Sequence, residues 1–149
     1  MDQKSTVLIV EDDFMIADMT EEMLVQNGYI VCGIARTVSE AVALGKKHRP
    51  DIALVDFRLA DGGLGPDVAA QLTAVQPIGI LYVTGNNTQV GMHGARGEAC
   101  LVKPYRFTDL LRGLEIVAGM ASGGVATPPF PRGFQLLRPE GPPQAGPSM

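Results

Sequence analysis

The chain has 149 residues, of which 46% are hydrophobic, and its formal net charge at pH 7 is −4. This size suits one globular domain with a substantial core. The twelve Lys and Arg residues form no basic stripe, and no apolar run reaches the length of a membrane helix or signal peptide, so we expect neither nucleic-acid nor membrane binding. Cys32 and Cys100 lack metal-ligand spacing, and two reduced thiols favour a cytoplasmic location.

Apolar segments alternate with helical patterns along the first 120 residues. Apolar and β-branched runs predict strands at 6–10, 29–34, 51–56, 78–84 and 100–102. Spacing and capping signals predict a helix that ends at Asn27-Gly28 and further helices at 37–48, 66–75 and 108–120. The segment 85–99 is long enough for another helix, but its glycines weaken it. Continuously apolar strands are buried on both faces, which predicts an α/β fold with a parallel sheet between helices.

The first helix carries an apolar stripe. Ile16, Met19, Met23 and Leu24 recur at helical spacing, with acidic residues on the other side. We expect this stripe to face the core.

The composition changes after Met120, where the last 29 residues contain seven of the eleven prolines. We therefore predict a domain at 1–120 and a mostly disordered tail at 121–149. Four apolar residues in this tail could nevertheless dock on the domain or on a partner: Phe130, Phe134, Leu136 and Leu137.

Polar side chains stand at the carboxyl ends of the predicted strands. In strand order they are Glu11, Asp12 and Asp13, then Asp56, then Thr84, and finally Lys103 before Pro104. In a parallel α/β sheet these ends lie at one edge, where ligands collect, so we expect the side chains to converge.

Crowded carboxylates resist joint ionisation unless a cation is present, and all-oxygen ligation with water suits Mg²⁺. Asp56 is the most informative of these acids because it ends a buried apolar strand, where an isolated charge is costly. A nucleophilic carboxylate beside a metal, a hydroxyl and an ammonium group is the arrangement that aspartyl-phosphate chemistry needs.

The segments VLIVEDD, IALVDFRL, YVTG and LVKPY, within about residues 5–120, resemble a response-regulator receiver domain of two-component signalling. The resemblance implies a doubly wound, flavodoxin-like sheet of five parallel strands in the order 2-1-3-4-5. It also implies a Mg²⁺ site in which Asp12 is a direct ligand, Glu11 acts through water, and Asp56 and the backbone carbonyl of Arg58 complete the protein contacts.

The same resemblance assigns roles in phosphoryl transfer. Asp56 matches the phosphoacceptor, Thr84 the switch hydroxyl and Lys103 the lysine that faces the phosphate. Arg58 and Asn86 should flank the attacking water and tune the lifetime of the phosphate. The peptide before Pro104 is a candidate for the cis form.

Two positions depart from the usual receiver pattern. Ala60 stands where a proline often follows the phosphoacceptor, and the next loop is rich in glycine. Cys100 stands where a Tyr or Phe usually swings inward as the hydroxyl moves, so the usual aromatic switch cannot operate at that position.

The resemblance implies that a histidine kinase or a histidine phosphotransfer protein phosphorylates Asp56. The tail is too short for a DNA-binding domain, so the output should be docking on an unknown downstream protein. The chain is then no enzyme beyond its own phosphotransfer and slow dephosphorylation. Open alternatives are a phosphate sink for a kinase and a constitutive interaction module. A Mg²⁺-dependent phosphohydrolase is disfavoured because Arg58 stands where such enzymes need a second acid.

Overall fold

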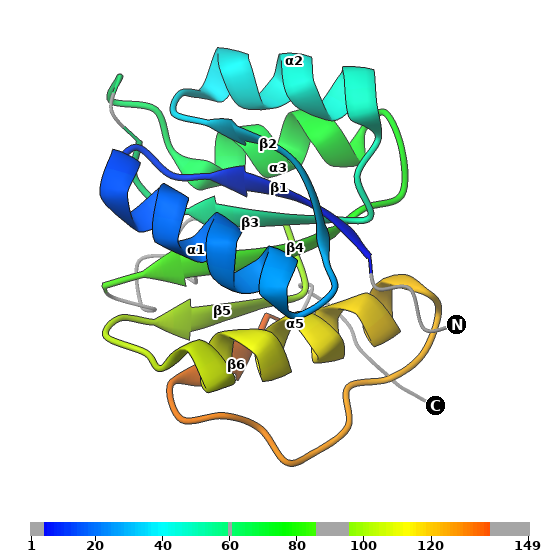
Figure 1. The fold of residues 1–149 in the computed structure, drawn as a ribbon. Coiled ribbons are helices and arrows are strands. Elements are labelled where there is room, and N and C mark those ends of the chain that lie inside the picture. The colour runs from blue at the N-terminus through cyan, green and yellow to red at the C-terminus, as the bar shows by residue number, and fades with distance from the viewer. Residues whose placement is uncertain (1–4, 60, 86–95, 138–149) are drawn as a thin grey trace.

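A computed structural model describes residues 5–59, 61–85 and 96–137 (Figure 1). The strands are β1 Thr6–Val10, β2 Ile30–Ala35, β3 Ile52–Asp56, β4 Gly79–Thr84, β5 Ala99–Val102 and β6 Phe134–Leu136. The helices are α1 Phe14–Gln26, α2 Val38–His48, α3 Gly65–Thr73 and α5 Phe107–Ala121. The helix considered for 85–99 falls mostly outside the described residues. Within them, no helix combines the length and apolar character needed to cross a membrane.

The strands form one sheet in the order β2-β1-β3-β4-β5-β6. The first five are parallel, as predicted, and the sixth is antiparallel to β5, so the predicted count of five is too small. Figure 1 shows α2 and α3 on one face and α1 and α5 on the other. Each face carries its own apolar core, which is why β3 and β4 read as continuously apolar.

The buried face of α1 differs from the predicted one. Met23 and Leu24 are buried as expected, but Ile16 and Met19 are 37% and 51% exposed. The helix instead places Ala17 and Thr20 against the sheet. Apolar spacing alone fits both orientations. Small residues at these two positions let the helix axis approach the strands closely.

The prediction of a disordered tail is wrong for residues 122–137, which we call the C-terminal strap; residues 138–149 lie outside the described ranges. The strap ends in β6, where Leu136 pairs with Ala99 and Phe134 with Leu101. Backbone hydrogen bonds continue the ladder, since the N–H of Val102 donates to the carbonyl of Gly133 at 3.0 Å. The prolines exclude a helix here, but they permit a short strand at a sheet edge.

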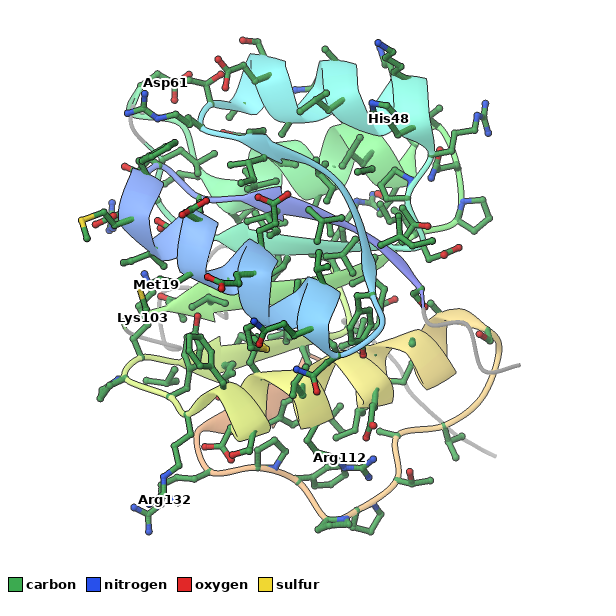
Figure 2. All side chains as sticks on the ribbon, viewed as in Figure 1. Met19, His48, Asp61, Lys103, Arg112 and Arg132 are labelled. Carbon is green, nitrogen blue, oxygen red and sulfur yellow. The ribbon has the colours of Figure 1, made fainter. Side chains whose placement is uncertain are left out.

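Helix α5 holds the strap from the other side. The guanidinium of Arg112 donates to the carbonyls of Thr127 at 2.6 Å and Pro129 at 3.0 Å (Figure 2). The rings of Phe130 and Phe134 stack with centroids 5.7 Å apart. The apolar residues of the tail therefore dock on the domain itself, one of the two destinations considered from the sequence.

We predict that a chain ending after Ala121 is less stable and less soluble than the full chain. Loss of the strap uncovers apolar surface and the hydrogen-bonding edge of β5, so the free energy of unfolding should fall by about 2 kcal/mol. The uncovered edge can pair with another chain. Urea unfolding and light scattering measure the two effects.

A chain ending after Leu137 is the matched control, because it keeps the strap and loses only the residues beyond it. It should unfold at the same urea concentration as the full chain. Equal stability and equal monomer content in both truncations would contradict a stabilising role for the strap.

Candidate functional site

The carboxyl ends of β1, β3 and β5 bring three charged residues together. The Nζ of Lys103 lies 3.6 Å from Oδ1 of Asp56 and 4.0 Å from Oε1 of Glu11. The two carboxylates are largely buried, with 13% and 10% of their side chains exposed, whereas Lys103 is 34% exposed. Residues remote in sequence therefore converge at one edge, as the strand order predicts.

A compact acidic cluster faces this lysine. Carboxylate oxygens of Glu11, Asp12 and Asp56 all lie within 4.8 Å of one another. Asp13 has a different role, because its Oδ1 accepts the backbone N–H of Ile16 at 3.2 Å and caps the start of α1. The backbone N–H of Asp13 donates to Oε2 of Glu11 at 3.1 Å.

The charges in this cluster are unbalanced. Burial raises the pKa of Glu11 to about 7, and the neighbouring Asp56 adds to the shift. Burial also raises the pKa of Asp56, although the ammonium of Lys103 acts in the opposite direction. Three carboxylate groups facing one nearby ammonium suit a hard divalent cation with oxygen ligands.

The backbone around Asp56 is fixed on two sides. The N–H of Phe57 donates to the carbonyl of Val83 at 3.0 Å, and the N–H of Gly65 donates to the carbonyl of Phe57 at 2.7 Å. A Cβ on Gly65 would lie 2.6 Å from the carbonyl oxygen of Asp56. Glycine is therefore required where α3 begins against the site. In the loop between β3 and α3, the exposed Arg58 forms a β-bridge with Leu64. The predicted contact between the carbonyl of Arg58 and a metal stays a prediction.

Thr84 and Lys103 are joined through their backbones. Thr84 ends β4 with 3% exposure, and its carbonyl accepts the N–H of Lys103 at 2.8 Å. The peptide between Lys103 and Pro104 is cis, which confirms that prediction. Asn86 lies outside the described residues, so its predicted role stays a prediction.

Cys100 lies inside the core of the site-bearing sheet. It is fully buried, and burial raises the pKa of its thiol to about 11. Its register partners are Tyr82 on β4 and Gln135 on β6. The side chain of Leu137 packs against the same core cluster. Cys100 therefore lies between β4 and β6 in the sheet, in a core cluster that the end of the strap helps to cover.

Two residues that were not predicted also lie at the site. Tyr105 and Thr20 line a small hollow together with Glu11 and Asp56. Burial raises the pKa of Tyr105 to about 12, with contributions from the two carboxylates. The position of Tyr105 directly after Lys103-Pro104 could have indicated it, whereas Thr20 gives no signal inside a helical pattern.

Comparison with known proteins agrees with this geometry. The sequence model of the response regulator receiver domain matches residues 7–115. The transcriptional regulatory protein PdtaR of Mycobacterium tuberculosis is 32% identical over 113 residues, covering 74% of this chain and 55% of PdtaR. The phyllosphere-induced regulator PhyR of Methylorubrum extorquens is 34% identical over 108 residues, covering 70% of this chain and 40% of PhyR. The chain thus spans about half the length of these relatives.

Among solved structures, one similar fold is the receiver domain of the sensor histidine kinase PA1611 from Pseudomonas aeruginosa, determined with magnesium coordinated in its active site cleft. It is 26% identical, has a TM-score of 0.69, and the match covers 77% of this chain and 98% of that one. The family match extends from the first strand into α5 and includes every described residue of the charged cluster. The chain belongs to the response regulator receiver domain family.

Proposed function

We propose that the chain is a phosphorylation-controlled signalling receiver in which Asp56 accepts a phosphoryl group from a histidine kinase or a histidine phosphotransfer protein. The observation that carries this proposal is the contact of 3.6 Å between Lys103 Nζ and Asp56 Oδ1 within a crowded acidic cluster. A structural ion pair needs no second and third carboxylate beside it, whereas phosphoryl transfer with a divalent cation does.

The chemistry follows from the position of Asp56. One carboxylate oxygen forms a bond to phosphorus while the bond between phosphorus and the donor's histidine nitrogen breaks, and the imidazole leaves. Lys103 lies within reach of the oxygens that the new phosphoryl group would bring. The hydroxyl of Thr84, at the end of the neighbouring strand, is the proposed hydrogen-bond donor to the same group.

Glu11, Asp12 and Asp56 would hold Mg²⁺, with the carbonyl of Arg58 as a further proposed ligand. The bound ion supplies neutralisation of the charge that accumulates on the transferring group. The raised pKa values of Glu11 and Asp56 support this assignment, because a cation would favour the charged forms that burial disfavours.

Replacement of the phosphoacceptor tests the proposal directly. The wild-type chain should incorporate phosphate from acetyl phosphate with Mg²⁺, and Asp56→Asn should incorporate none, because the amide oxygen is not a nucleophile of comparable strength. Intact mass measurement detects the added group. Asp18→Asn, at an exposed position of α1, is the control and should behave as wild type. Incorporation by Asp56→Asn at the wild-type level would contradict the assignment.

The pKa of Glu11 predicts an unusual pH dependence of stability. The folded chain keeps a proton on Glu11 up to about pH 7, whereas the unfolded chain loses it near the ordinary value of 4.5. Without metal, the contribution of Glu11 to the free energy of unfolding should therefore fall by roughly 1–3 kcal/mol as the pH rises through this interval. Added Mg²⁺ should reverse the loss above pH 7, because it binds the charged carboxylates.

Urea unfolding across the same pH range, with and without Mg²⁺, measures this effect. Glu11→Gln carries no titratable group and should lack this decline. Other acids titrate as well, so the comparison between wild type and variant isolates Glu11. Parallel pH profiles for the two chains would show that Glu11 titrates at its ordinary value.

An exposed apolar patch on α1 is the proposed docking site for the phosphodonor. It consists of Phe14, Met15, Ile16 and Met19, and the first two are 70% and 71% exposed. The patch begins three residues after Glu11, and Figure 2 shows Met19 on the same side of the molecule as Lys103. A donor must cover the site closely to exclude water, and apolar side chains beside the site suit a protein donor better than a small one.

We predict that Met19→Gln slows phosphoryl transfer from a protein donor and leaves transfer from acetyl phosphate unchanged. Loss of one central apolar contact should lower kcat/KM for the protein donor by about tenfold. Val25→Gln is the matched control, since Val25 is 54% exposed on the far half of α1. Stopped-flow or gel assays with both donors separate docking from chemistry. An equal loss with both donors would place the defect in the site instead.

A further inference from the structure

Tyr82 is the largest fully buried side chain among the described residues, and it lies on β4 two residues before Thr84. Side chains alternate along a strand, so these two residues face the same side of the sheet. The hydroxyl of Tyr82 donates a hydrogen bond to the backbone carbonyl of Arg96. One aromatic residue therefore connects the strand that carries Thr84 to the backbone that leads into β5.

The ring of Tyr82 also contacts the neighbour of the phosphoacceptor. Phe57 directly follows Asp56, and the rings of Phe57 and Tyr82 meet edge to face with centroids 6.3 Å apart. The N–H of Phe57 is itself bonded to β4 through the carbonyl of Val83 at 3.0 Å. A shift at Asp56 or Thr84 thus has a direct packing route to Tyr82.

The other end of this route is the entrance to β5, residues 96–98. Gly97 has φ of +139°, and a Cβ there would lie 2.9 Å from Cε2 of Tyr82. Oε1 of Glu98 accepts the N–H of Ile80 at 2.7 Å, and the N–H of Glu98 donates to the carbonyl of Ile80 at 3.1 Å. Three hydrogen bonds therefore join β4 to residues 96–98: two with Ile80 and one with Tyr82. The bond from Tyr82 is the nearest of the three to Thr84 in sequence.

The surroundings of Cys100 explain why an aromatic residue is absent from that position. Cys100 lies beside Tyr82 in the β4–β5 register and beside Gln135 of the strap in the β5–β6 register. Tyr82 fills the same core cluster, and Leu137 packs against that cluster from the end of the strap. A ring at position 100 would compete with Tyr82 for interior volume, and the strap covers the outer edge of its strand.

We propose that Tyr82 is the positioning residue that couples the phosphorylation site to the entrance of β5, in place of an aromatic residue at position 100. This inference rests on the proposed function of Asp56. Because Tyr82 is fully enclosed, it acts through its hydrogen bond to Arg96 and not by swinging to the surface. Movement of Thr84 toward a phosphoryl group shifts β4, and the phenol transmits this shift to residues 96–98.

The test is Tyr82→Phe in the full chain, which keeps the ring and removes the hydroxyl. Hydrogen exchange of the amides at 97–99 is measured with Mg²⁺ alone and with Mg²⁺ plus beryllofluoride, a phosphoryl mimic. In wild type the two states should differ, and in Tyr82→Phe the difference should fall by at least half. Incorporation of phosphate from acetyl phosphate should stay at the wild-type level.

Tyr29→Phe is the matched control, because Tyr29 is a buried tyrosine in the core of the opposite face, and its response should equal that of wild type. A merely structural hydroxyl would raise exchange equally in both states of Tyr82→Phe and leave their difference intact, which would overturn the proposal. A wild-type chain that accepts phosphate without any change at 97–99 would overturn it as well, while the proposed function stands. A wild-type chain that accepts no phosphate would overturn both.

Discussion

Negative charge at the carboxyl edge of the sheet is the constraint on which the rest of the structure depends. Asp56 ends a strand whose four preceding residues are buried, so its carboxylate meets the core on one side and two further acids on the other. Burial raises the pKa of both Glu11 and Asp56. The single positive charge of Lys103 offsets only part of the repulsion between the carboxylates. The packed core holds the carboxylates close together, and their mutual repulsion is the reason that the cluster fits a divalent cation.

The C-terminal strap makes β5, the strand that precedes Lys103, an internal strand of the sheet. Lys103 directly follows β5, a strand of four residues that is paired on both sides. On one side β5 pairs with β4, and the last register pair joins Thr84 and Val102. On the other side it pairs with β6, for example at Leu101 and Phe134. A lysine at the end of an edge strand could reorient with that strand. Here the strand is internal, because β6 pairs with its outer edge.

Sequence reasoning predicted the parallel strands and the convergence of Glu11, Asp56 and Lys103, because strand polarity alone dictates that carboxyl ends meet. It predicted the orientation of α1 incorrectly, since apolar spacing does not reveal that Ala17 fits closer to the sheet than Met19. It also misjudged residues 122–137. Proline content favoured disorder, but that segment pairs with β5 and accepts hydrogen bonds from Arg112 of α5. Local composition does not reveal such tertiary contacts.

The absence of an aromatic residue at position 100 has to be considered together with its register partner, Tyr82. The residue type at 100, taken alone, indicates a receiver without its usual aromatic switch. The register of β4 and β5 places Tyr82 beside it, in the same core cluster and in contact with Phe57, the residue after Asp56. Interior volume is conserved when a small and a large side chain exchange places across a pair of strands, and packing cost is then low. What does change is the mode of coupling: a ring that can leave the core signals by exposure, whereas an enclosed phenol signals through the backbone group to which it is bonded.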